Sequence, residues 1–130
     1  MEKEIAKFLA ASSFAVAGAS TNQQKYGNQI FRALVTSGRT VYPLNPFAEQ
    51  INGIAAYASI ADLPEVPESV SIVTPPAVTR QVVADAIRCG VQHVWVQPGA
   101  TDSESSESAR RAGLTVIDNG SCVLVLLARK

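Results

Sequence analysis

Five short apolar runs, each cut off by glycine, proline or a small polar residue, constrain the fold of this 130-residue chain more than any other feature. A strand that is buried on both faces of a parallel sheet has this continuous apolar character. Glycine and proline after such a run mark the point where the strand must end. Counted with the residues that end them, the runs are 14–18, 40–46, 69–76, 91–99 and 114–118.

Helical segments lie between these runs, because apolar residues there recur at the spacing of a helix face. Gly38 and Gly90 are natural terminators of two of these segments, and the last one begins with capping residues and ends before Gly113. The predicted helices are 2–11, 30–35, 78–87 and 102–112.

Strands that alternate with helices predict a parallel sheet with right-handed crossovers and helices over both faces. We therefore expect an α/β fold, a three-layer doubly wound mainly parallel sheet, in a single domain over residues 1–130. A turn at Asn52-Gly53 precedes a third short strand over residues 54–57. The apolar segment 122–128 forms either a strand or a short helix.

Composition excludes several classes of function. Basic and acidic residues number 11 each, so the formal net charge is zero and no global positive field attracts nucleic acid. No apolar stretch reaches the roughly 18 residues that a membrane helix needs. Glutamates within residues 1–7 argue against a secretory signal. Cys89 and Cys122 fit neither a metal site nor a disulfide framework, so we expect a cytoplasmic protein with two thiols.

Small and polar residues follow the predicted strands, at the edge where a doubly wound sheet binds ligands. Gly18, Ala19 and Ser20 follow the first strand, and Lys25 is the one charged residue near this junction. Glycine, the start of the following helix and a lysine together suit a phosphate group. Prolines after later strands supply rigid apolar walls. The set predicts a nearly uncharged groove for an elongated, phosphate-bearing ligand with an apolar ring.

The glycine-rich fingerprints of other nucleotide sites are missing. Counted from Gly18, the dinucleotide pattern needs glycine where Ser20 and Gln23 stand. The second strand ends at Leu44 and Asn45, with no carboxylate for a ribose diol. No Gly-Lys-Ser/Thr sequence provides a nucleotide-hydrolase loop. These departures disfavour NAD(H) binding and nucleotide hydrolysis. A glycine such as Gly18, taken alone, is explained as well by a plain turn as by contact with a ligand.

Residues suited to catalysis are few. His93 is the only histidine and lies inside a strand pattern, so we interpret it as structural. Asp118 is the only carboxylate directly after a strand, so no carboxylate pair is indicated. Cys122 follows the last strand, but its neutral neighbours offer no activation as a nucleophile. The sequence therefore indicates no catalytic or metal-binding constellation.

In their order along the chain, six short motifs resemble the stand-alone coenzyme A-binding proteins. That family is similar to the CoA-binding domain of the succinyl-CoA synthetase α subunit. The motifs are VAGAS, KYG, VYPLNP, SIVTPP, VWVQPGA and VIDNGSCV, and they span nearly the whole chain. The resemblance implies a Rossmann-like domain that binds coenzyme A or an acyl-CoA across the point where the strand order reverses.

The resemblance also implies which residues contact the ligand. The first loop would flank the diphosphate, the second the adenosine, and the third would form a wall along the ligand. The implied binding residues are Gly18, Ala19, Ser20, Lys25, Tyr26, Gly27, Asn45, Pro46, Val73, Thr74, Pro75, Pro76, Gln97, Gly99 and Cys122. The family's last motif often ends in Asp-Arg-Cys, from which residues 119–121 depart, and this leaves a special role of Cys122 open.

We expect a non-catalytic binding, sensor or accessory module for coenzyme A, with a second copy of the chain or a partner enzyme as its protein partner. The synthetase's phosphorylated histidine and grasp domain have no counterpart among the motifs, so ligase activity of this chain alone is not expected. The alternatives are a small acyl- or thiol-transfer enzyme using Cys122, an NAD(H)-binding redox sensor, and a structural domain with an empty crevice. Neither nucleic acid nor a membrane is an expected partner.

Overall fold

A computed structural model describes residues 1–128 and places five parallel strands in one sheet, in the order β2-β1-β5-β6-β7. The strands are β1 (Phe14–Ala17), β2 (Val41–Leu44), β5 (Ser69–Ile72), β6 (His93–Val96) and β7 (Thr115–Ile117). The helices are α1 (Glu2–Leu9), α2 (Tyr26–Thr36), α3 (Pro76–Cys89), α4 (Ser103–Arg111) and α5 (Val123–Ala128), with a 3₁₀ turn η1 (Ile60–Asp62).

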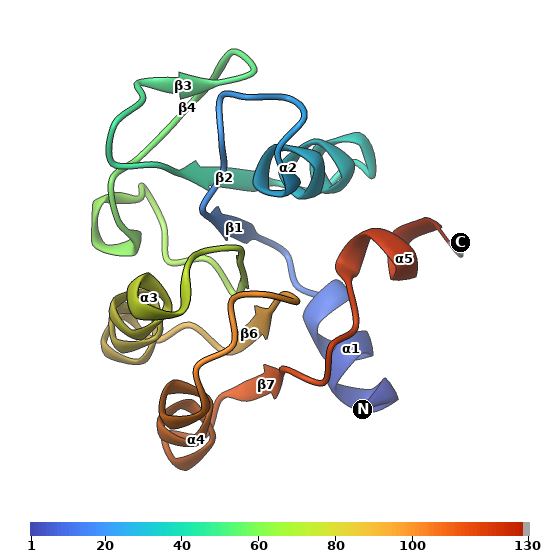
Figure 1. Cartoon of the computed structure of the whole chain (residues 1–130), viewed down its shortest axis with the longest axis vertical. Coiled ribbons are helices and arrows are strands. Elements are labelled where there is room, and N and C mark those ends of the chain that lie inside the picture. Colours follow the sequence, from blue (N-terminus) through green and yellow to red (C-terminus); the bar gives the residue numbers. More distant parts are fainter. Residues whose placement is uncertain (129–130) are drawn as a thin grey trace.

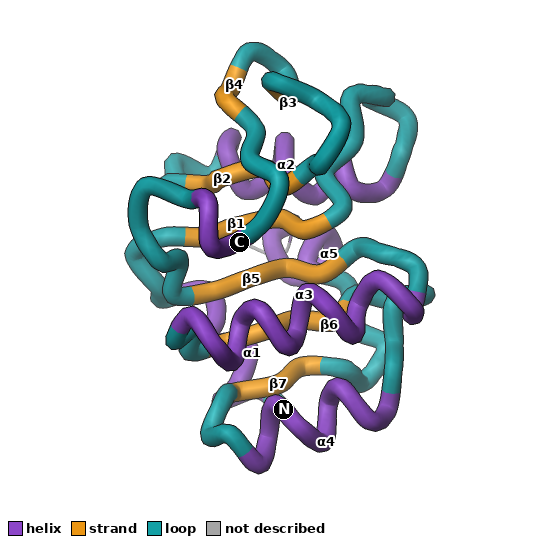
Figure 2. Tube along the Cα trace, turned by 90° about the vertical axis from the view of Figure 1, so that its left-hand side faces the viewer, coloured by secondary structure: helices purple, strands orange, loops and turns teal. Residues whose placement is uncertain are grey.

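Helices cover both faces of this sheet. Figure 1 shows α3 and α4 on one side and α1, α2 and α5 on the other, and Figure 2 shows α3 and α4 in front of the five stacked strands. The predicted α/β class, the three layers and the parallel sheet are therefore confirmed. Within residues 1–128, no helix is long and apolar enough to cross a membrane.

The central strand β1 shows why the sheet needs both layers. All of its side chains are buried. Phe14 and Val16 belong to the apolar cluster formed with α1, α2 and α5, which also contains the buried Trp95. Ala15 and Ala17 belong to the other cluster, which includes the inner face of α3. Because successive side chains of a strand point to opposite faces, a wholly apolar strand requires a covering on each side.

Residues 50–55 depart from the prediction for this region. Asn52 and Gly53 both have positive φ, at 51° and 83°, which is the conformation of a two-residue hairpin turn. The turn joins β3 (Gln50–Ile51) to β4 (Ile54–Ala55) in a separate antiparallel pair. A tight turn makes its two flanking strands antiparallel, so β4 is shorter than the predicted strand over 54–57 and lies outside the parallel sheet. Only Tyr57, at the end of the predicted strand, forms an isolated parallel bridge with Leu44 of β2. The segment 122–128 forms a helix, one of its two predicted states.

Strand register brings three loops to one level. Ala17, the last residue of β1, pairs with Leu44 of β2 on one side and with Ile72 of β5 on the other. Each of these residues ends its strand, so the three following loops begin side by side. The strand order reverses between β1 and β5, which is where doubly wound sheets open a crevice.

Candidate ligand-binding site

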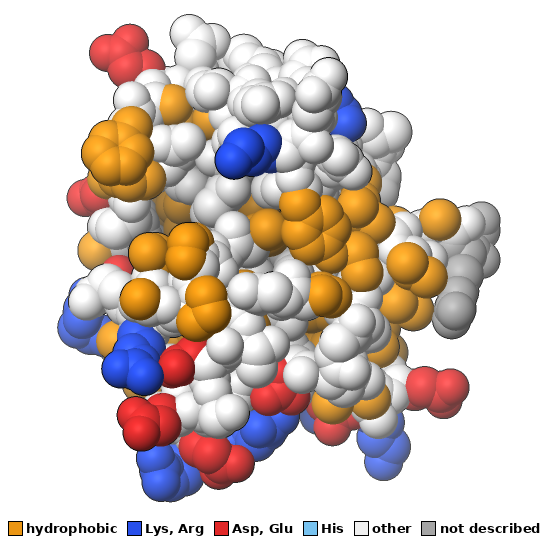
Figure 3. All heavy atoms as spheres, in the orientation of Figure 1, with side chains coloured by type: hydrophobic (Ala, Val, Ile, Leu, Met, Phe, Trp, Pro, Cys, Tyr) orange, Lys and Arg blue, Asp and Glu red, His pale blue; other side chains and the backbone are white. Residues whose placement is uncertain are grey.

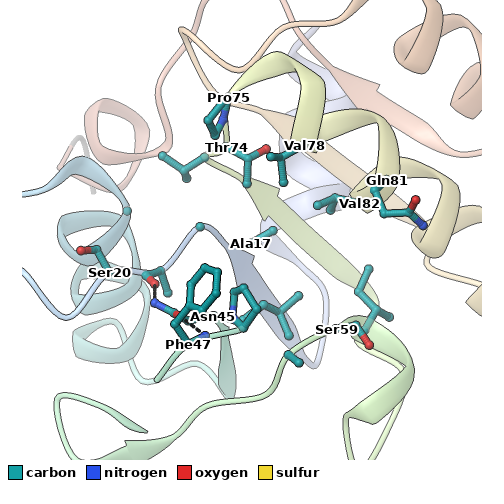
Figure 4. Close-up of a pocket in the computed structure, with 18 of the residues that line it drawn as sticks. Ala17, Ser20, Asn45, Phe47, Ser59, Thr74, Pro75, Val78, Gln81 and Val82 are labelled. Carbon is teal, nitrogen blue, oxygen red and sulfur yellow. Dashed lines mark hydrogen bonds between the residues drawn. The ribbon is translucent and has the colours of Figure 1, made fainter. Parts of the chain in front are cut away.

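The loops after β1, β2 and β5 enclose a cavity of about 570 Å³ at the carboxyl edge of the sheet. Its volume falls within the roughly 300–1,000 Å³ that small-molecule sites occupy. Figure 4 shows the pocket with Asn45 and Phe47 on the β2 side and Thr74, Val78 and Val82 across from them. The cavity therefore lies at the carboxyl edge of the sheet, where the sequence analysis expected a ligand.

Most of the predicted contact residues line this cavity. They are Gly18, Ala19, Ser20, Lys25, Tyr26, Gly27, Asn45, Pro46, Val73, Thr74 and Pro75. The wall is nearly uncharged, since within the described lining Lys25 is the only cation and Asp85 the only carboxylate. Figure 3 shows the same contrast on the surface: charged side chains gather at the end where α4 lies, and the face around β1 and α3 is mainly apolar or uncharged.

Two glycines of the first loop are required by backbone packing. Gly18 has a φ of +90°, and a β-carbon on it would lie 2.1 Å from the carbonyl oxygen of Val73. A β-carbon on Gly27, in the first turn of α2, would lie 2.0 Å from the carbonyl oxygen of Gly18. Both separations are far inside van der Waals contact, so only glycine fits either position. The sequence suggested that these glycines admit a ligand, and the structure adds that they let three chain segments pack together.

Two hydrogen bonds to Ser20 hold the rest of the first loop. The Asn28 side-chain amide donates to the backbone oxygen of Ser20 at 2.7 Å, and the backbone N–H of Asn22 donates to Ser20 Oγ at 3.1 Å. Lys25 is exposed and occupies the N-cap of α2, where no side chain caps the helix. Unpaired N–H groups and the positive end of the helix dipole therefore add to the Lys25 charge on this side of the cavity.

The second loop is fixed by Asn45. Its side-chain amide donates to the backbone oxygen of Ala19 at 2.9 Å, which ties the end of β2 to the first loop. Its Oδ1 accepts from the backbone N–H groups of Phe47 and Ala48 at 2.8 and 3.1 Å. Asn45 therefore serves as an internal brace of the cavity wall and sets the backbone of the residues that follow it.

Threonine hydroxyls fix the third loop. Thr74 Oγ1 lies 2.7 Å from Thr79 Oγ1, and Thr79 is fully buried and also donates to the backbone oxygen of Ala100 at 2.8 Å. Pro75 occupies the N-cap position of α3 and Pro76 the first helical position, which suits a residue without an N–H group. Pro75 lines the cavity, whereas Pro76 is exposed outside it.

One wall of the cavity was missed by the sequence analysis. It consists of one face of α3 together with the segment before η1, and the residues that line it are Val78, Gln81, Val82, Asp85, Ala58, Ser59 and Ile60. Helical spacing was the available signal, because residues three or four apart share a face. The sequence analysis used that spacing only to predict the helix. In the structure Val78 is 47% exposed, whereas Thr79, Val83 and Ala86 are buried.

Gln97, Gly99 and Cys122 do not line the main cavity. Gln97 is fully buried beneath it, where its amide donates to Ser71 Oγ at 3.1 Å and its Oε1 accepts from the backbone N–H of Val123 at 3.1 Å. Gly99 borders a separate small hollow on the far side of the third loop. These residues follow β6 and β7, which lie farther from the point of strand reversal, so their loops do not reach the crevice.

Tyr26 connects Cys122 to the cavity. The tyrosine hydroxyl donates to Cys122 Sγ and lies 3.4 Å from Gln97 Oε1, while Tyr26 itself lines the cavity. Burial, with a further contribution from the hydrogen bond to Cys122, raises the pKa of Tyr26 above its usual range. Tyr26 therefore remains a neutral hydrogen-bonding group at physiological pH.

His93 and Asp118 lie in structural settings. His93 begins β6, at the edge of the sheet opposite the cavity, and its Nδ1 is buried without a hydrogen-bond partner within residues 1–128. Burial lowers the pKa of His93 from its usual value. Asp118 forms an ion pair with Arg110 at 2.6 Å. In the part of the chain that the structure describes, no group of three histidine, cysteine or acidic side chains could hold a metal ion.

Comparison of the sequence with known protein families gives one match over most of the chain. A family model described as "CoA binding domain" matches residues 12–128. The α subunit of acetate–CoA ligase [ADP-forming] II from Pyrococcus furiosus is 30% identical over 105 residues, which cover 80% of this chain and 23% of that one. The matched stretch covers less than a quarter of the length of this ligase and of three further acetate–CoA ligases, two from Archaeoglobus fulgidus and one from Methanocaldococcus jannaschii.

Solved structures share the fold. A hypothetical protein from Pyrococcus horikoshii OT3 superposes with a TM-score of 0.93 at 31% identity, covering 99% of this chain and 91% of that one. The apo form of the dinucleotide-forming acetyl-coenzyme A synthetase 1 of Ca. Korarchaeum cryptofilum superposes with a TM-score of 0.74 at 29% identity. That likeness covers 84% of this chain but 26% of the synthetase.

Proposed function

Because this chain belongs to the family of CoA-binding domains, we propose that it binds coenzyme A or an acyl-CoA in the cavity at the carboxyl ends of β1, β2 and β5. The observation that carries the proposal is the convergence of three braced loops on a nearly uncharged cavity with a single lysine. A ligand that combines phosphates, an apolar ring and a neutral amide chain matches that lining.

Each part of the ligand has a matching wall. The diphosphate lies by the first loop, where backbone N–H groups of residues 18–20, the start of α2 and Lys25 provide positive charge. The purine ring enters the apolar part between the second loop and α3. The neutral pantetheine arm runs along the wall of Val73, Thr74 and Pro75 toward solvent.

We assign the chain a binding role, as a sensor or as an accessory subunit that presents the ligand to a partner enzyme. Within the described lining of the cavity there is no histidine or cysteine to act on a thioester. Its curated relatives are named as acetate–CoA ligases, and the matched residues make up 23% or less of their length, which supports a partner that supplies the chemistry. Cys122 lies outside the lining, so the transferase alternative has no support from the geometry.

Titration calorimetry with CoA, acetyl-CoA and NADH tests this function directly. We expect saturable binding of CoA and acetyl-CoA and none of NADH, since the end of β2 carries no carboxylate for a ribose diol. A comparison of CoA with acetyl-CoA shows whether the site distinguishes the thiol from its ester. Binding of NADH with no binding of CoA would reverse the assignment in favour of a redox sensor.

A further inference from the structure

Phe47 is the one large apolar side chain that is almost wholly in water among residues 1–128. It is 96% exposed, whereas Met1, Val66, Val78 and Val125 are 45–50% exposed. A fully exposed phenylalanine gains nothing for folding, because its ring is no better covered in the native chain than in the unfolded one. The same ring lines the cavity. Its position is therefore explained by the cavity and not by the core.

The backbone under the ring is fixed even though the ring is exposed. Asn45 Oδ1 accepts from the N–H of Phe47 at 2.8 Å and from that of Ala48 at 3.1 Å. The amide of the same side chain donates to Ala19. Phe47 is thus presented at one position relative to the first loop, and little backbone freedom remains to be lost when a ligand meets it.

An apolar surface faces Phe47 across the cavity. Figure 4 shows the Phe47 ring on the β2 side, with Val78 and Val82 of α3 on the opposite side. Ile60 also lines the cavity and is buried. A space with an aromatic ring on one side and two valines on the other suits a flat heteroaromatic ring better than a phosphate or a flexible chain.

Charge at this end of the cavity leads to the same conclusion. In doubly wound dinucleotide domains an arginine near the end of the second strand accommodates the 2′-phosphate of NADP, which shows how a ribose phosphate at this place is held. Here the residues that follow β2 are Asn45, Pro46 and Phe47, and the only cation in the described lining, Lys25, belongs to the first loop. The second loop thus offers an aromatic face where a phosphate would need a positive charge.

We propose that Phe47 stacks on the purine ring of the bound ligand, with Val78 and Val82 against its other face. The purine ring is then the recognised feature at this end of the site, and the ribose 3′-phosphate contributes little. This inference rests on the proposed CoA-binding function and assigns recognition of the purine ring to Phe47.

Calorimetry with the two halves of the ligand tests the assignment. For Phe47→Ala we expect CoA and adenosine 3′,5′-bisphosphate to bind about 5- to 150-fold more weakly, the range found for loss of base–aromatic stacking. Binding of 4′-phosphopantetheine, which lacks the ring, should be unchanged. Val66→Ala is the matched control, because Val66 is 48% exposed and lies outside the cavity lining. Neither substitution should shift the thermal midpoint.

Phe47→Trp provides a second measurement that does not depend on loss of binding. The native Trp95 is fully buried, so a ligand-dependent change in the fluorescence of the variant relative to the native protein reports on position 47. We expect quenching by CoA with affinity retained. Dephospho-CoA should bind within about fivefold of CoA, because the described lining has no cation on the β2 side to pair with the 3′-phosphate.

The outcomes separate this inference from the function on which it rests. If the native protein binds CoA and Phe47→Ala binds it as well as Val66→Ala does, the stacking role is wrong and the CoA-binding function stands. If the loss falls on 4′-phosphopantetheine, Phe47 contacts the other half of the ligand and the inference is overturned. If the native protein binds no CoA, the function is wrong and the inference falls with it.

Discussion

The carbonyl oxygen of Gly18 occupies the place that a β-carbon on Gly27 would need, with a separation of 2.0 Å. The first turn of α2 therefore packs directly on the backbone of the loop that leaves β1. Gly18 in turn packs against the carbonyl group of Val73 in the loop after β5. Two neighbouring segments of the chain and a third from the loop after β5 thus meet here mainly through backbone atoms.

Gly27→Ala tests this contact by the sign of its effect. Alanine in place of glycine ordinarily stabilises a helix by roughly 0.5–1 kcal/mol. Here the added methyl overlaps the Gly18 carbonyl, so we expect the free energy of unfolding to fall by about 1–3 kcal/mol. Urea denaturation followed by circular dichroism gives this value. A variant more stable than the native protein would show that the first loop yields easily and that the contact has no structural importance.

Lys25→Ala tests the position of the ligand's phosphates. If Lys25 makes a charge-assisted contact with phosphate, its loss should weaken CoA binding by about 1–3 kcal/mol, and the deficit should shrink as ionic strength rises. Calorimetry in low and moderate salt measures both effects. Lys3→Ala is the control, since Lys3 is an exposed lysine of α1 away from the cavity. Equal affinities of the two variants would remove Lys25 from the site.

Gln97→Leu tests the buried amide beneath the cavity. The substitution leaves the backbone N–H of Val123 and the hydroxyl of Ser71 without the partners that Gln97 gives them. We expect the free energy of unfolding to fall by about 1–3 kcal/mol, the cost of a buried polar group left unsatisfied. Gln92→Leu, at an exposed position, should change it little. A loss of the same size in both variants would mean that leucine itself causes the effect.

His93 should make stability depend on pH near neutrality. Burial lowers the pKa of His93 below 6.5, against an opposing effect of Glu68 and with a small added effect of Lys7. The folded protein then binds this proton less readily than the unfolded chain, so the free energy of unfolding falls as pH drops through 6.5 and towards the folded-state pKa. His93→Gln should remove the slope, because the sequence has one histidine. Urea titrations between about pH 5 and pH 8 measure it; equal slopes would contradict the assignment.

The position of the crevice could be predicted because the end of each strand depends on residues that are adjacent in the sequence. The end of a strand such as β1 can be predicted from the residue that follows it, and a parallel sheet brings the carboxyl ends of its strands to one edge. The structure adds the register, in which Ala17 pairs with Leu44 and with Ile72, so that the three strands end at one level. At Asn52-Gly53 the sequence predicted a turn and a strand after it, but not the antiparallel partner β3, because a two-residue strand is too short for a periodic pattern.

The orientation of α3 and the position of Phe47 could not be predicted from the sequence. Helical spacing places Val78 and Val82 on one face of α3, but only the packing of α3 shows that this face lines the cavity. Phe47 is an isolated aromatic in a loop and belongs to no pattern. The family resemblance implied Gln97 and Cys122 as binding residues, but they follow strands farther from the strand reversal and lie outside the main cavity.

The crevice contains positions that cannot be enlarged and positions that can. Backbone atoms of Gly18, Gly27 and Val73 pack together, so any larger residue at positions 18 or 27 disrupts the scaffold. Phe47 is 96% exposed and Val78 47% exposed, so these two side chains bear little of the packing that holds the fold. Redesign of the scaffold for a different heteroaromatic ligand should therefore begin at those two positions.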